Sequence, residues 1–112
     1  MIDQHRLLRA IAAVEGNNWS IPGGGYQFTT ATWYDYTRIP YQRAKDAQSA
    51  TTVALRVLED AALRLIKAGI EPTVYLLALR WRYGHAGMTQ RQHTKDNDYA
   101  IRVRNLYDDP NF

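Results

Sequence analysis

The segment from Val74 to Trp81, VYLLALRW, constrains the fold more than any other part of the chain. In a helix, its apolar side chains would point in almost every direction, and such a helix is stable only when other elements surround it. Pro72 lies just upstream and suits the start of a helix. We therefore predict a mainly α-helical, compact domain whose central helix opens at Pro72, runs from Thr73 to Tyr83 and is buried.

The remaining helices are predicted from caps, apolar periodicity and helix-stopping residues. We expect them at residues 3–15, in a short segment capped by Thr29 or Thr30 that stops before Pro40, at residues 49–69, and between Asp96 and Asp108. Polar loops should cover residues 16–28 and 84–96, with a short extended piece, at most a small β element, at residues 26–28. Trp33 and Trp81 are expected in the core. The whole chain, residues 1–112, should form a single domain.

Composition excludes some functions and leaves others open. The chain has no cysteine, which rules out a disulfide framework, a thiolate metal site and a cysteine nucleophile. Its histidines, His5, His85 and His93, lack the spacing of metal ligands, so we expect no metal. A net charge of +3 suits an anionic partner such as cell-wall polymer, a membrane surface or nucleic acid. There is neither a run long enough to span a membrane nor a signal-peptide pattern, so we expect either a mature or excised domain or a protein that works without the general secretion route.

Glu15 is an unusual residue for its position. With the 100° step of a helix, it falls about 40° from Ile11, between Leu8 and Ile11 on the apolar face. Desolvation there disfavours the charged form of a carboxyl, which suits a general acid that protonates a glycosidic oxygen. The usual two-carboxylate scheme needs a second acid about 5 to 9 Å away. Asp35 is the nearest candidate in sequence, but its position does not favour it.

Three short motifs follow in the right order for a known family: EGNNWSI at 15–21, GGYQFT at 24–29, and the pair Thr32-Trp33. This block resembles the core of resuscitation-promoting factors. Its Gly-x-x-Gln element is similar to that of soluble lytic transglycosylases and goose-type lysozymes. A weaker likeness extends over residues 79–84 and 99–107. The resemblance implies a lysozyme-like fold and cleavage of the β-1,4 bond between MurNAc and GlcNAc in peptidoglycan.

The resemblance also implies roles for individual residues. Glu15 would be the single catalytic carboxyl, acting first as acid and then as base, while the 6-hydroxyl of the sugar closes an anhydro ring. Gln27 would bind the sugar through its amide, and Tyr99 would orient Glu15 or the N-acetyl group. The residues expected to stack against or line the substrate are Trp19, Tyr26 and Tyr83. It further implies a monomer that needs no cofactor and works in the cell envelope, in the periplasm or outside the cell.

The chain departs from these relatives at four points. The interval between Glu15 and Gly24 is shorter, Gly16 replaces a serine, Arg82 stands where transglycosylases carry asparagine, and the cysteines frequent in resuscitation-promoting factors are absent. A catalytically degenerate domain that binds glycan or a protein is therefore the first alternative. The second is a basic nucleic-acid-binding domain, which the divergence of Arg80 from Arg82 and of Arg102 from Arg104 around their helices argues against.

Overall fold

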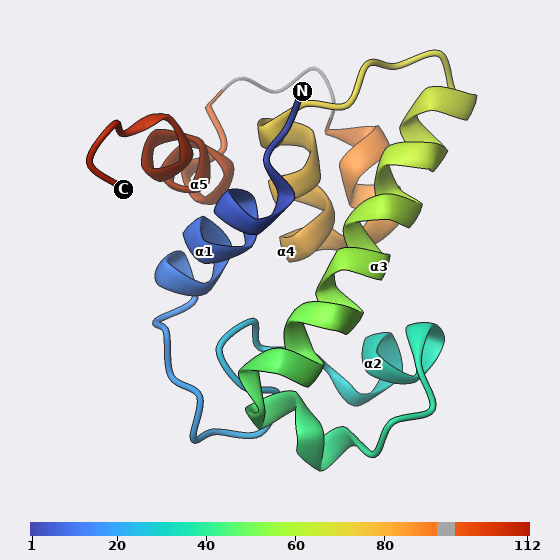
Figure 1. The fold of residues 1–112 in the computed structure, drawn as a ribbon. Helices are drawn as coiled ribbons and strands as arrows, with labels where there is room; N and C mark the ends of the chain where they lie inside the picture. The colour runs from blue at the N-terminus through green and yellow to red at the C-terminus, as the bar shows by residue number, and fades with distance from the viewer. Residues whose placement is uncertain (92–95) are drawn as a thin grey trace.

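A computed structural model describes residues 1–91 and 96–112, and within these ranges it contains helices and no strands (Figure 1). The elements are α1 (Gln4–Val14), α2 (Thr30–Tyr36), the 3₁₀ helix η1 (Tyr41–Lys45), α3 (Ala47–Lys67), α4 (Val74–Gln90) and α5 (Asp98–Asp108). The prediction of a compact, mainly helical domain is confirmed. No helix among the described residues is long and apolar enough to cross a membrane.

Helix α4 is the centre of the molecule. It packs against α5 on one side and α3 on the other (Figure 1). Residues 75–80 are all buried, including the charged Arg80. The Thr73 side chain caps its first turn by accepting from the backbone N–H of Leu76 at 3.1 Å. The burial that the all-round apolar pattern of this segment predicts is therefore confirmed, because α3 and α5 cover its opposite sides.

The predicted start of the central helix at Pro72 is two residues early, because Thr73 is the cap and α4 begins at Val74. The caps predicted for the first helix and the short second helix are present. Asp3 accepts from the backbone N–H of Arg6 at 3.0 Å, and Thr29 accepts from that of Thr32 at 3.2 Å. Trp33 is fully buried, as expected. Helix α3 begins two residues earlier than predicted because Asp46 caps it, and η1 was not expected. Ile66, an apolar residue of α3, is 59% exposed.

Two local predictions are wrong. We predicted that the central helix ends at Tyr83, whereas α4 breaks at Gly84, with φ 79° and ψ −177°, and then resumes to Gln90. The part of the helix after Gly84 buries Met88 completely, and this apolar burial offsets the conformational entropy lost when the segment becomes helical. The predicted loop also covers residues 92–95, among them His93, and these residues lie outside the part of the chain that the structure describes.

The extended piece expected at residues 26–28 is a tight turn instead. Gly23, Gly24 and Gln27 have positive φ angles of 88°, 66° and 53°. The N–H of Gln27 donates to the carbonyl of Gly24, and that of Phe28 donates to the carbonyl of Gly23, both at 3.0 Å. The glycine run supplies backbone conformations that L side chains rarely adopt, so the chain curls here.

A polar cluster ties α2, α3 and α4 together. The Tyr36 hydroxyl donates to Asp60 Oδ2 at 2.6 Å and lies 3.0 Å from His85 Nε2. The same carboxylate oxygen lies 3.2 Å from His85 Nε2 and 3.2 Å from Arg64 Nε. The bond from Tyr36 lowers the pKa of Asp60. Burial lowers the pKa of His85, and the charges of Arg80 and Arg64 add to this effect, outweighing Asp60.

The turn around Gly24 should be intolerant of any side chain. A Cβ on Gly24 would lie 1.9 Å from the carbonyl oxygen of Ala44, whereas a Cβ on Gly16 would meet nothing within 4 Å. Both glycines have positive φ, so alanine is strained at either position. We expect Gly24→Ala to lower the free energy of unfolding by at least about 3 kcal/mol and Gly16→Ala by about 1 kcal/mol. Urea unfolding measures both, and equal losses would contradict the close approach.

The lowered pKa of His85 makes stability depend on pH. The unfolded chain binds a proton on His85 more readily than the folded chain does. The contribution of neutral His85 to the free energy of unfolding is therefore present above pH 6.5, its ordinary pKa, and is lost as the pH falls below that value. Asp60 titrates at lower pH and changes little in this window. We expect the urea midpoint to fall between about pH 7.5 and about pH 5, and to fall less in His85→Gln. His5→Gln is the matched control, because His5 is exposed, and its urea midpoint should fall with pH as much as that of the wild-type chain.

Candidate functional site

Glu15 lies at the end of α1, where it faces residues from α4 and α5. It is the C-cap residue of α1 and is partly buried. It lines an open hollow of about 300 Å³ where these three helices meet. The other residues that line the hollow are Val14, Arg82, Tyr83, Asp98, Tyr99 and Arg102.

A hydrogen bond joins Glu15 to Tyr99. The Tyr99 hydroxyl donates to Glu15 Oε2 at 2.8 Å, although the two residues are 84 positions apart in the chain. Burial raises the pKa of Tyr99, and the negative charge of Glu15 raises it further, against the smaller effects of Arg82 and Arg102. Tyr99 is therefore a neutral hydrogen-bond donor near neutral pH. The direction of this hydrogen bond follows from that, because a phenol that keeps its proton can donate it to the carboxyl.

Gln27 contacts the backbone of Glu15. Its side-chain Nε2 donates to the backbone carbonyl oxygen of Glu15 at 2.7 Å. The bond fastens the turn at residues 23–28 to the end of α1. Gln27 is exposed, and a carboxamide also has a carbonyl oxygen and a second N–H that this bond does not use. Gln27 is not among the residues that line the Glu15 hollow, but it lines a second cavity beside it.

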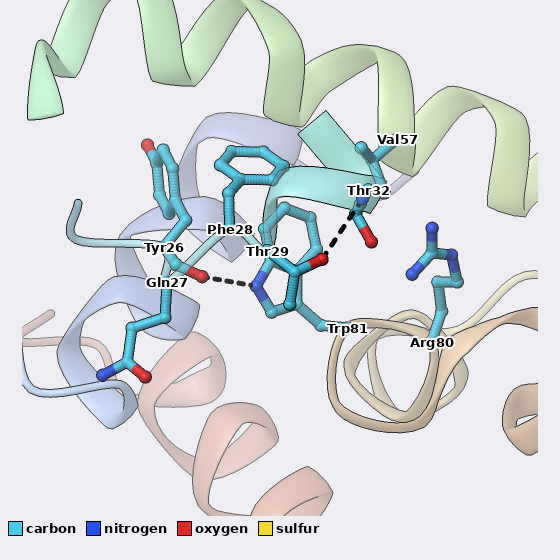
Figure 2. A pocket seen from close by; sticks show the side chains of 8 residues that line it. All are labelled: Tyr26, Gln27, Phe28, Thr29, Thr32, Val57, Arg80 and Trp81. Atoms are coloured by element: carbon cyan, nitrogen blue, oxygen red, sulfur yellow. Dashed lines mark hydrogen bonds between the residues drawn. The ribbon is translucent and has the colours of Figure 1, made fainter. Parts of the chain in front are cut away.

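A second cavity lies between the same turn and α4 (Figure 2). Its lining includes Gln27, Thr29, Thr32, Arg80 and Trp81. The indole Nε1 of Trp81 donates to the backbone carbonyl of the residue before Gln27, at 3.0 Å. Trp81, expected in the core, is only partly buried and forms one wall of this cavity.

The predicted aromatic residues separate into two groups. Tyr26 is only 5% exposed, and its hydroxyl is 2.8 Å from Thr51 Oγ1, so it offers almost no ring face to a sugar. Burial raises the pKa of this phenol. Trp19 packs edge-on against Tyr26 at 5.1 Å between ring centroids, and it covers Gly25. Both lie outside the Glu15 hollow.

Tyr83, in contrast, lines the hollow with Glu15 and is 38% exposed. The guanidinium of Arg91 lies over its ring at 4.2 Å, and its hydroxyl accepts from Asn97 Nδ2 at 2.9 Å. The structure thus brings Glu15, Tyr83 and Tyr99 together and places Gln27 beside them.

Asp98, Arg82 and Arg102 also lie at the hollow, and our sequence analysis did not place them there. Two of them could have been predicted from the sequence. Asp98 and Arg102 are four residues apart on α5, and both lie close to Tyr99 around that helix. Arg82 lies over the ring of Tyr99, 5.6 Å from its centroid. Asp35, the nearest acid in sequence, is exposed on α2 and is not among the residues around Glu15.

Within residues 1–91 and 96–112, no three His, Asp or Glu side chains gather in a group that could hold a metal ion. Comparisons of the chain with protein-family models, with curated proteins and with solved structures found no significant match.

Proposed function

We propose that this chain is a peptidoglycan-cleaving glycosidase of the lysozyme-like type, with Glu15 as its catalytic acid. The observation that carries the proposal is the Glu15 carboxyl at the end of α1, which a tyrosine from α5 holds at the edge of an open hollow. The sequence motifs around Glu15 and Gln27, which resemble those of resuscitation-promoting factors, support the same conclusion. The proposed bond is the β-1,4 link between MurNAc and GlcNAc.

The hydrogen bond from Tyr99 suggests which oxygen of Glu15 would act. Oε2 accepts from the Tyr99 hydroxyl, so a proton on the carboxyl belongs on Oε1. In the proposed first step, Oε1 gives this proton to the glycosidic oxygen as the bond from C1 of MurNAc to that oxygen breaks. In the second step, the resulting carboxylate takes a proton from the nucleophile that bonds to C1. Glu15 ends protonated, as it began.

The nucleophile has two candidate sources. If the 6-hydroxyl of the same MurNAc attacks, one carboxyl is sufficient and the product is an anhydro sugar. If water attacks, the product is a reducing sugar, and Asp98 is the acid that shares the hollow with Glu15. The proposal covers both reactions, and the products distinguish them.

The charges around the hollow suit an acidic glycan. Arg82 and Arg102 line it with Glu15, and the chain carries a net charge of +3. Peptidoglycan strands carry carboxylates on their peptides, which these guanidinium groups would attract. A setting at the cell envelope follows from this substrate.

Replacing Glu15 with glutamine tests the catalytic role directly. The amide keeps the size of the side chain but has no proton of suitable acidity to give. We expect Glu15→Gln to lower the rate of peptidoglycan cleavage by about 10² to 10⁴. Mass spectrometry of soluble products from purified peptidoglycan measures this rate and identifies the chain ends as anhydro or reducing.

Glu59→Gln is the matched control, because Glu59 is an exposed glutamate on α3, and it should cleave like the wild-type chain. No cleavage by the wild-type chain on several types of cell wall would exclude the enzyme. Binding to the same walls without products would then favour the degenerate, glycan-binding domain.

Replacing Tyr99 with phenylalanine tests whether its hydroxyl positions Glu15. The ring and its packing are retained, and the hydrogen bond to Oε2 is lost. We expect kcat for Tyr99→Phe to fall about tenfold with little change in KM. A purely structural role would instead lower the free energy of unfolding and leave kcat of the folded fraction unchanged, so urea unfolding is measured on the same sample.

A further inference from the structure

Arg80 is a buried cation that lacks a full set of partners. It is only 7% exposed, and its Nε has no hydrogen-bond partner in the part of the chain that the structure describes. Among the described residues, its guanidinium makes one long hydrogen bond, from Nη2 to the Tyr36 hydroxyl at 3.5 Å. That hydroxyl donates its own proton to Asp60. No described carboxylate lies within ion-pair distance of Arg80.

An arrangement of this kind is unfavourable in isolation. A buried charge is normally paired and fully hydrogen-bonded, because its removal from water is unfavourable. Asp60 compensates Arg80 only through the Tyr36 hydroxyl, and Asp60 is already paired with Arg64 at 3.2 Å. The guanidinium thus retains a strong capacity to bind an anion.

The cavity beside Arg80 has the size and lining for such an anion. It has a volume of about 60 Å³, whereas a single water needs about 10 to 15 Å³. Figure 2 shows the Arg80 guanidinium and the Thr32 side chain facing one another across it. Phe28 and Val57 supply apolar walls, and the exposed Thr29 lies at its margin. A carboxylate on a short apolar stem would fit both parts of this lining.

We propose that this cavity is a subsite for a carboxylate of the glycan, bound by Arg80. The inference rests on the proposed function, and Gln27 links the two sites, because it lines this cavity and bonds to the backbone carbonyl of Glu15. The carboxylate nearest to a MurNAc ring is that of its own lactyl ether. It is free where the strand has lost its stem peptide and is an amide where the peptide remains. The subsite therefore selects peptide-free MurNAc.

The experiment titrates the full-length, ¹⁵N-labelled chain with three ligands and follows the Arg80 Nε–H signal by NMR. That signal is assigned by through-bond correlations in the wild-type chain. MurNAc carries the free lactyl carboxylate, GlcNAc has the same ring without it, and muramyl dipeptide has the lactyl group as an amide. We expect MurNAc to shift the signal with half-saturation at about tenfold lower concentration than GlcNAc. Muramyl dipeptide should bind no more tightly than GlcNAc.

Equal half-saturation for MurNAc and GlcNAc would overturn the subsite, as would muramyl dipeptide binding as tightly as MurNAc. Arg80→Gln should abolish the preference for MurNAc. Arg38→Gln, which removes an exposed arginine of the same charge, should keep it. If Arg80→Gln does not fold, the comparison of ligands on the wild-type chain still decides, because the signal reports on Arg80 itself.

The outcome is separable from that of the proposed function. None of the three ligands contains the bond that Glu15 would cleave, so binding is measured without turnover. A chain that cleaves peptidoglycan but does not prefer MurNAc would refute the subsite alone. A chain that prefers MurNAc through Arg80 but cleaves nothing would refute the enzyme and keep the subsite.

Discussion

Burial of α4 between α3 and α5 is the constraint on which both candidate sites depend. Residues 75–79 are buried on every side, so the helix has no freedom to rotate in its packing. The next four residues therefore have fixed positions, two of them at the second cavity and two at the Glu15 hollow. Arg80 lines the second cavity, Trp81 bonds to the glycine-rich turn, Arg82 lies over Tyr99, and Tyr83 lines the Glu15 hollow.

The turn at residues 23–28 is the other part of this arrangement, and its backbone is packed closely on two sides. Gly24 touches the carbonyl of Ala44, and Gly25 lies directly beneath Trp19, so neither position has room for a Cβ. Close approach on both sides brings the Tyr26 carbonyl within 3.0 Å of the Trp81 indole nitrogen. A bulkier turn would separate the two sites.

The sequence predicted what depends on local signals. Helix starts at Asp3 and Thr29 follow from side-chain caps, and the place of Glu15 follows from helical periodicity. It did not predict what depends on partners distant in the chain. Gly84 breaks α4 as its residue type suggests, but only the burial of Met88 shows that the helix resumes. The hollow around Glu15 likewise depends on how α1 and α5 pack.

That packing explains how a hydrogen bond forms between residues so far apart in sequence. Near the start of α1, Arg6 Nε donates to the Tyr107 carbonyl at 2.6 Å, and the backbone N–H of Asp3 donates to the Tyr107 hydroxyl at 2.8 Å. At its far end, Glu15 accepts from Tyr99. Helices α1 and α5 are therefore antiparallel and joined at both ends. A shift of either helix along its axis would strain one pair or the other, so the position of the Glu15 carboxyl is set by the fold and not by its own flexible side chain.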